Sequence, residues 1–240
     1  MINASKRACI FLSLAVLALP ALCGIAFASG ACCSIARADS DRVNLTLVGA
    51  SAMNHENIGA DMYELSQQAL LLKLGKPIGG GFVLQAQIGL PTATKLSHQN
   101  MKLSGQGGFI YGAGLGYKLP RLLDPVDFYA SASYSRSLGY LDSDKMGAID
   151  SSFHINELQV LFIGEAALSS KTSLYGGVRA YSGKNQLKDN KTGAKTNGDQ
   201  EGSLAGLAGI RQKLSDKLSL VADAGFGHTR VLGIGAVFSF

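Results

Sequence analysis

The sequence is poor in the side chains from which chemical sites are usually built. Its four cysteines all precede Asp39, and the adjacent pair Cys32-Cys33 has no second pair or nearby histidine that would complete a metal site. The histidines are also four, and no two of them have the spacing of metal ligands: His55, His98, His154 and His228. We therefore expect neither a metal nor another cofactor.

Charge and tryptophan are scarce as well. Only 16% of the residues are charged, and tryptophan is absent. The formal net charge of +5 is largely a property of the N-terminal segment, because residues 1–38 hold Lys6, Arg7 and Arg37 and no acid. This distribution argues against a nucleic-acid partner. The 30 glycines form no phosphate-binding loop, since no helix start follows Gly79-Gly80-Gly81 or the glycine-rich stretch 112–116.

The N-terminal segment has the order of a secretory signal. Basic residues come first, residues 9–28 are almost wholly apolar, and small residues follow. Cleavage after Ala28 and cleavage after Ala38 both fit, and we predict a signal peptide over residues 1–38 because its removal leaves a cysteine-free chain suited to an oxidising compartment. A transmembrane helix over 9–28 and a lipid-anchored Cys32 are the alternatives. Residues 39–240 are then one domain.

Residues 43–240 alternate between apolar and small or polar side chains, which predicts β-strands. Counting this period gives ten strands, with eight as the alternative, and no long helix. The ten predicted segments are residues 43–52, 67–76, 82–90, 108–119, 127–138, 155–168, 174–182, 203–213, 218–227 and 231–240.

The predicted connections alternate in length. The short ones are 75–81, 119–126, 169–172 and 215–217, and the long polar ones are 53–66, 91–107, 139–154 and 183–202. Short turns at one end and long loops at the other are typical of transmembrane antiparallel up-and-down β-barrels. Residues 61–74 also fit an amphipathic helix, but an even strand number favours a strand for the second half of this segment.

The composition of the two strand faces indicates which one points outward. One face carries leucine, phenylalanine and tyrosine, whereas the other carries glycine and serine with little lysine or glutamate. Such a face would be unusual against water but suits the inside of a narrow barrel. The apolar face also carries an aromatic group near each end of the strands, as the girdles of membrane barrels do. The short-turn group is Phe82, Tyr117, Phe128 and Phe240, and the loop-side group is Phe109, Tyr111, Tyr134 and Phe226.

The last strand carries the most specific signal. It ends at Phe240, with a second aromatic at Phe238 and a glycine at Gly235. This ending resembles the closing strand of Gram-negative outer-membrane β-barrels of the OmpA, OmpX and Opa type, in which such residues are read by the barrel assembly machinery. The resemblance implies export to the outer membrane of a Gram-negative bacterium. It implies as partners the assembly machinery, periplasmic chaperones, outer-membrane lipid and lipopolysaccharide.

Seven charged residues fall on the inward face of the predicted barrel: Lys73, Lys118, Glu157, Glu165, Arg179, Arg211 and Asp223. A charge among lipid tails costs about 2–4 kcal/mol at the midplane, so inward placement is expected. We expect a charge network that fills the lumen, with Glu165, Arg179, Arg211 and Asp223 paired across neighbouring strands. A selectivity lining for a narrow passive channel is the alternative, although a ten-stranded barrel is close to the size that side chains fill.

A structural, surface-contact or adhesion role follows from the resemblance. A hydrolase at the rim is the third choice, because Asp223 with His228, or Ser152 with His154, offers catalytic residue types without an ordering motif. We expect no enzyme. The lysine-rich segment 184–200 is either a solvated loop or a contact for an anionic partner such as lipopolysaccharide.

Overall fold

The computed structural model describes residues 42–58, 61–98, 101–120, 125–141, 151–227 and 230–240, and all of their regular structure is β-strand. The strands are β1 (Asn44–Ile58), β2 (Asp61–Gly79), β3 (Phe82–His98), β4 (Met101–Gly105), β5 (Gly108–Lys118), β6 (Val126–Leu141), β7 (Ser151–Ala167), β8 (Thr172–Asp189), β9 (Lys195–Ser215), β10 (Leu218–Gly227) and β11 (Arg230–Ser239). The predicted signal peptide lies outside the described residues. Within them, no helix has both the length and the apolar character needed to cross a bilayer.

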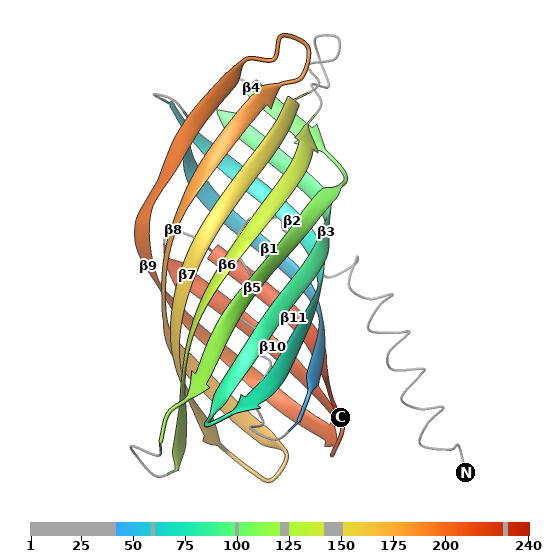
Figure 1. The fold of residues 1–240 in the computed structure, drawn as a ribbon, viewed down its shortest axis with the longest axis vertical. Coiled ribbons are helices and arrows are strands. Elements are labelled where there is room, and N and C mark those ends of the chain that lie inside the picture. Colours follow the sequence, from blue (N-terminus) through green and yellow to red (C-terminus); the bar gives the residue numbers. More distant parts are fainter. Residues whose placement is uncertain (1–41, 59–60, 99–100, 121–124, 142–150, 228–229) are drawn as a thin grey trace, which may run out of the picture.

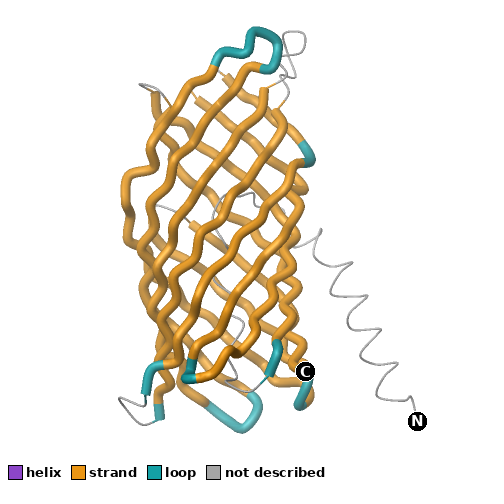
Figure 2. Tube along the Cα trace, viewed as in Figure 1, coloured by secondary structure: helices purple, strands orange, loops and turns teal. Residues whose placement is uncertain are grey.

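The strands form one closed antiparallel barrel (Figures 1 and 2). Strands that follow one another in the sequence pair with each other, except β4 and β5; β11 pairs with β1, and the β2–β3 pairing completes the circle. Strands β4 and β5 pair with different parts of β3, one above the other, so together they fill one strand position in the wall (a stave). The barrel therefore has ten such positions. The ten-stranded prediction is therefore confirmed. The C-terminus lies at the end of the barrel that carries the short turns, as an even number of staves requires (Figure 1).

The predicted orientation of the faces is also confirmed. On β7 the odd-numbered side chains from Ser151 to Glu165 are all buried, whereas Leu158, Val160 and Phe162 are exposed on the outside. The same apolar exterior continues around the barrel with Leu70, Leu84, Ile88, Leu115, Val178, Ile210 and Ile234. Side chains alternate across a strand, so one correct parity fixes the whole wall.

The long connections differ from the prediction, because strands occupy most of them. Strand β1 runs to Ile58 and β2 begins at Asp61, while β8 and β9 extend to a turn at 190–194. On β2, β3, β6 and β7 the alternation inverts beyond the predicted strands: apolar side chains point inward and polar ones point outward. Leu65, Leu96, Leu141, Phe153 and Ile155 are buried inside the barrel, whereas Lys95 and Lys184 are exposed. The sequence pattern identified strands by their outward apolar residues, so the predicted strands ended where the apolar residues change to the inward face. Residues 61–74 belong to β2 throughout, which rules out the helical alternative.

Candidate functional site

The interior of the barrel is the candidate site, and β7 shows how it is filled along its whole length. From the loop end to the turn end, its buried side chains are Ser151, Phe153, Ile155, Glu157, Gln159, Leu161, Ile163 and Glu165. From Phe153 onward, two apolar residues are followed by two polar ones, Glu157 and Gln159, then by two apolar ones and finally by Glu165. The lumen is thus a stack of layers, and each layer is completed by side chains from other strands.

The most deeply buried charged layer is the pair of Glu157 and Arg179. Arg179 Nη2 donates to Glu157 Oε1 at 3.0 Å, and the two side chains are only 1% and 3% exposed. The guanidinium carbon of Arg179 also lies 4.5 Å from the centre of the Tyr181 ring. Glycine at position 183, directly opposite Glu157 on β8, has no side chain to occupy this space. A buried pair of this kind fixes both side chains, because removing either one leaves an uncompensated charge.

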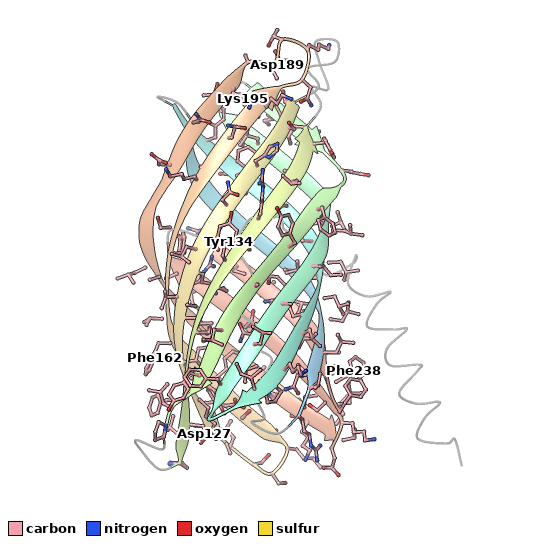
Figure 3. The ribbon with its side chains drawn as sticks, viewed as in Figure 1. Asp127, Tyr134, Phe162, Asp189, Lys195 and Phe238 are labelled. Atoms are coloured by element: carbon pink, nitrogen blue, oxygen red, sulfur yellow. The ribbon has the colours of Figure 1, made fainter. Side chains whose placement is uncertain are left out.

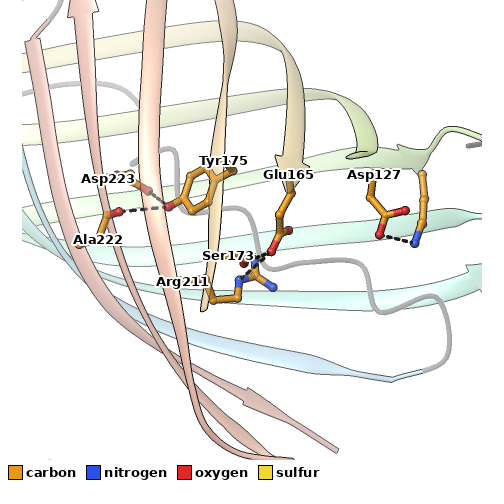
Figure 4. Close-up of polar contacts among 8 residues, drawn as sticks. Asp127, Glu165, Ser173, Tyr175, Arg211, Ala222 and Asp223 are labelled. Atoms are coloured by element: carbon orange, nitrogen blue, oxygen red, sulfur yellow. Dashed lines mark hydrogen bonds and ion pairs between the residues drawn. The ribbon is translucent and has the colours of Figure 1, made fainter. Parts of the chain in front are cut away.

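A second polar layer lies toward the short turns (Figure 4). Ser173 donates to Glu165 Oε1, and Arg211 Nε lies 3.8 Å from the same oxygen. The Tyr175 hydroxyl donates to Asp223 Oδ2 at 3.1 Å. These contacts span more than one strand step, since Glu165 lies on β7 and Arg211 on β9.

Gly209 makes the hydrogen bond between Tyr175 and Asp223 possible. It lies on β9 between Tyr175 of β8 and Asp223 of β10, directly opposite both. A Cβ atom there would lie 2.3 Å from Cζ of Tyr175. The phenol ring therefore crosses β9 above Gly209 to reach the carboxylate of Asp223.

We predicted pairing between residues on adjacent strands, Glu165 with Arg179 and Arg211 with Asp223. The structure shows Arg179 in contact with Glu157 on the adjacent strand, Glu165 in contact with Arg211 two strands away, and Asp223 accepting from Tyr175 two strands away. Inward side chains thus also meet across an intervening strand, where they cross the narrow lumen or lie over a glycine.

The two lysines of the predicted set lie in less enclosed positions. Lys118 Nζ lies 3.2 Å from Asp127 Oδ2 and 5.7 Å from the centre of the Tyr129 ring, near the short turns. Lys73 is half-buried on β2. Asp127, like Tyr175 and Tyr181, was not among the predicted site residues, although inward parity on its strand would have identified it.

An apolar layer closes the loop half of the lumen, where we had expected polar filling. It consists of Leu65, Leu96, Leu103, Leu141, Phe153 and Ile155, with Tyr63 and Leu187 packed against it. Below it, Ser137 donates to Gln67, and Gln67 donates to Thr94. Most of these residues lie in or beside segments predicted as loops, and this explains why the layer was missed.

The outer surface defines where the membrane would end. Tyr134 and Leu158 are exposed on neighbouring positions of β6 and β7, and the Tyr134 hydroxyl donates to Asn156 Oδ1 at 2.9 Å (Figure 3). Beyond Asn156 the residues of the same face of β7 are also polar: His154 is half-buried, and Ser152 is buried and donates to Asn190. The segment from Glu157 to Ala167 therefore has the 9–11 residues or so that a tilted strand needs to cross a bilayer, and residues 151–156 lie outside it.

The predicted assembly-signal residues close the barrel. Phe240 is exposed, and its backbone nitrogen donates to the Val43 carbonyl at 2.9 Å. Phe238 pairs with Leu45 of β1 and Leu218 of β10, and its ring lies on the outside (Figure 3). Gly235 faces inward, where a Cβ would lie 2.6 Å from the Leu47 carbonyl oxygen.

The residue pairs considered for catalysis have other partners. Ser152 donates to Asn190 Oδ1, and His154 Nδ1 lies 3.2 Å from Arg136 Nη2. His228 lies outside the described residues. Within the described part of the chain, no three His, Cys, Asp or Glu side chains gather as a metal site would require.

Comparison with known proteins identifies the fold. No protein-family model matches the sequence, and no curated protein matches it. Among solved structures, the outer-membrane protease OmpT from Escherichia coli aligns with a TM-score of 0.51 at 8% identity, covering 84% of this chain and 98% of that one. The fold is that of the outer-membrane β-barrels.

Other outer-membrane barrels align less closely. The translocator domain of the autotransporter NalP from Neisseria meningitidis gives a TM-score of 0.48 at 14% identity, covering 99% of this chain and 98% of that one. The attachment invasion locus protein Ail of Yersinia pestis gives 0.40 at 13%, covering 83% and 99%. At these identities the likeness concerns the fold alone. The apolar exterior of the wall is that of a barrel that spans a membrane, as this fold does in the aligned structures.

Proposed function

We propose that this outer-membrane barrel is a closed, rigid support for contacts at the cell surface, with a structural or adhesive role and no catalytic one. The single observation that carries the proposal is the inverted alternation beyond the membrane boundary. Strands β7 and β9 have 17 and 21 residues, whereas about 9–11 suffice to cross a bilayer. On β7 this excess places the apolar Phe153 and Ile155 inside the barrel and the polar His154 and Asn156 on the outward face, as a soluble barrel would.

The projecting part is internally packed. The apolar layer around Phe153 and Leu141 fills it in the way a hydrophobic core fills a soluble domain. Strands β10 and β11 have only 10 residues each, so the rim is low there and high at β8 and β9 (Figure 1). A packed interior supports a surface role, because a stiff projection presents its tip in one geometry.

The tip of the β8–β9 hairpin is held by its own side chains. Asp189 accepts from the backbone nitrogens of Lys191 and Thr192 and from the Thr192 hydroxyl. The hydroxyl contact and the backbone contacts, in that order, lower the pKa of the Asp189 carboxyl. The chain then turns at Gly193, whose φ of 74° favours glycine. This tip, from Asp189 to Lys195, is the outermost described part of the barrel (Figure 3).

The stacked layers also favour a closed lumen over the narrow channel that is the alternative. The purified protein in planar bilayers distinguishes the two: we expect no large, stable current. A steady, ion-selective conductance from the native chain would overturn the closed lumen and favour the channel.

Display at the surface is tested by labelling. Thr192→Cys places a thiol at the tip, and Lys171→Cys places one in the β7–β8 turn at the other end. On intact cells a membrane-impermeant maleimide should modify the first and not the second. Equal labelling of both, or labelling of Lys171→Cys alone, would contradict the proposed orientation.

The adhesive part of the role has its own test. Cells that display the barrel are compared with cells that display a variant in which residues 190–194 are replaced by Asn-Gly, for attachment to surfaces and to one another. The native barrel should increase attachment and the shortened tip should not. If the native barrel gives no increase over empty cells, the role is structural only.

A further inference from the structure

The outer wall of the projecting part carries a group of basic residues on four neighbouring strands, β6 to β9. Arg136 of β6, Asn156 of β7 and Lys184 of β8 lie directly opposite one another in one row. Two rows further from the membrane, Ser152, Lys188 and Lys195 lie opposite one another on β7, β8 and β9. His154 lies in the row between them. We call Arg136, His154, Lys184, Lys188 and Lys195 the cationic face.

The electrostatics of His154 show that these charges act on the same region. Burial lowers the pKa of its imidazole, and the positive charges of Arg136, Lys188 and Lys195 lower it further. These cations come from β6, β8 and β9, so they surround the β7 side chain. Asp199, opposite Lys184, is the acid of the first row. Lys188 and Lys195 are directly opposed, and such side chains lie about 4.5–5.5 Å apart at Cβ, close enough for one anion to contact both. In the first row Asn156 lies between Arg136 and Lys184, and its amide can donate to the same anion.

The height of the cationic face on the barrel specifies its ligand. Below it lie Leu158 on β7, with Ser182 of β8 opposite, and then the apolar Leu204 on β9 and Val178 on β8; the three apolar side chains are all more than half exposed. Tyr134 marks the boundary through its contact with Asn156. A ligand that contacts both zones needs acyl chains in the membrane and negative charge just above them.

We propose that the cationic face binds the phosphate groups of an anionic glycolipid of the outer leaflet, a lipopolysaccharide, whose acyl chains lie against the apolar wall beneath. This site rests on the proposed orientation, with the long strands outside the cell. Guanidinium and ammonium groups form charge-assisted hydrogen bonds with phosphate oxygens, and Arg136 supplies a fork while the lysines supply point charges. Neighbouring strands hold these groups in place, so the site exists before the lipid arrives.

The experiment measures lipopolysaccharide binding to the purified barrel in detergent, by titration of a fluorescent lipopolysaccharide. The test variant is Arg136→Gln with Lys184→Gln. The matched control is Lys95→Gln with Lys102→Gln, which removes two exposed lysines from β3 and β4, outside the cationic face. Losing charged hydrogen bonds to phosphate should weaken binding by about tenfold or more in the test variant, and the control should bind as the native barrel does. Dephosphorylated lipopolysaccharide should bind the native barrel as weakly as lipopolysaccharide binds the test variant.

Three results would overturn the site. Equal weakening in the control would show that charge anywhere on the rim suffices. Undiminished binding of the dephosphorylated lipid would exclude phosphate recognition. Tighter binding of a soluble acidic polysaccharide, heparin, than of lipopolysaccharide would assign the cationic face to an acidic glycan instead. None of these affects conductance or cysteine labelling, so the site can fail while the proposed function stands.

Discussion

At the scale of single residues, the lumen is organised by glycines that lie beside long inward side chains. Tyr175 lies over Gly209, and a Cβ at Gly112 or Gly116 would lie 3.0 Å from the amide nitrogen of Gln87 or Gln85. Barrel closure brings inward side chains together in a narrow space. A large side chain on one strand therefore requires a glycine, which has no side chain, at the neighbouring position on the next strand. This explains why glycine stands at these inward positions.

Gly209→Ala should therefore destabilise the barrel. The added methyl would displace the Tyr175 ring and its hydrogen bond to Asp223, and overpacking of this kind costs about 1–3 kcal/mol. Gly206→Ala is the control on the same strand, because its Cβ would meet nothing closer than the Phe226 carbonyl oxygen at 3.9 Å. Urea unfolding in lipid vesicles measures the difference. Equal midpoints for the two variants would show that the ring has room to move.

His154 should make stability depend on pH. Its folded-state pKa lies below the ordinary value of 6.5, so the unfolded chain takes up a proton first as the pH falls. Stability should be full above pH 6.5 and decrease as the pH falls from there toward the folded pKa. His154→Gln should remove this part of the dependence between pH 7 and pH 5, as followed by urea midpoints. Bound phosphate should raise the pKa of His154, visible as a shift of its imidazole titration in NMR spectra.

At the scale of elements, β11 both closes the barrel and carries the ending that resembles an assembly signal. Its backbone pairs with β1 and β10, and this pairing does not depend on the Phe240 side chain, which is 70% exposed. Removal of that side chain should leave the folded wall intact. An effect on the yield of folded protein in cells would then arise during assembly.

Deletion of Phe240 should lower the amount of heat-modifiable barrel in outer membranes while in vitro unfolding changes little. Phe82→Ser is the matched control, since it removes an exposed aromatic from the same end of the barrel but leaves the terminus intact. Comparable losses for both variants in cells would indicate a general need for aromatic residues. A normal level of the deletion variant would exclude the terminal signal.

The N-terminal segment carries a prediction that depends on sequence alone. We expect the mature chain to begin at Asp39 and to hold no cysteine, since signal peptidase would cut after Ala36-Arg37-Ala38. Mass spectrometry of protein extracted from membranes measures the N-terminus directly. A mature chain that keeps Cys32 would indicate cleavage after Ala28 or lipid attachment.

At the scale of the whole molecule, the barrel wall has a membrane-facing half and a water-facing half. Its turn half has lipid-facing leucine and an interior in which polar and apolar layers alternate, and its loop half has a polar exterior and an apolar interior layer. The lumen is thereby closed by layers of different chemistry in series: the Phe153 layer, the Glu157–Arg179 pair and the Glu165–Arg211 group.

Because the layers are in series, opening one should not open the barrel. Glu157→Ala with Arg179→Ala removes both charges of the middle layer, so neither is left unpaired, and we expect its current in planar bilayers to stay near that of the native chain. Adding Leu141→Gly and Phe153→Gly, which also thins the apolar layer, should still leave the current low, because the cluster of Leu161, Ile163, Tyr175 and Leu207 and the Glu165–Arg211 group remain. The opposite result, large currents from the charge variant alone, would assign the closure to that pair.

The sequence by itself determined the membrane-spanning parts of the ten strands and the face that each of their residues occupies, because side-chain alternation is a local property of an extended chain. It also placed Glu157, Glu165, Arg179, Arg211 and Asp223 on the inward face. Only the tertiary structure decided which of them meet, since Tyr175 reaches Asp223 over Gly209 and Glu165 reaches Arg211 past β8. It alone showed how far the strands extend, because beyond the membrane the apolar and polar faces exchange sides and the alternation that identified the strands reverses its meaning.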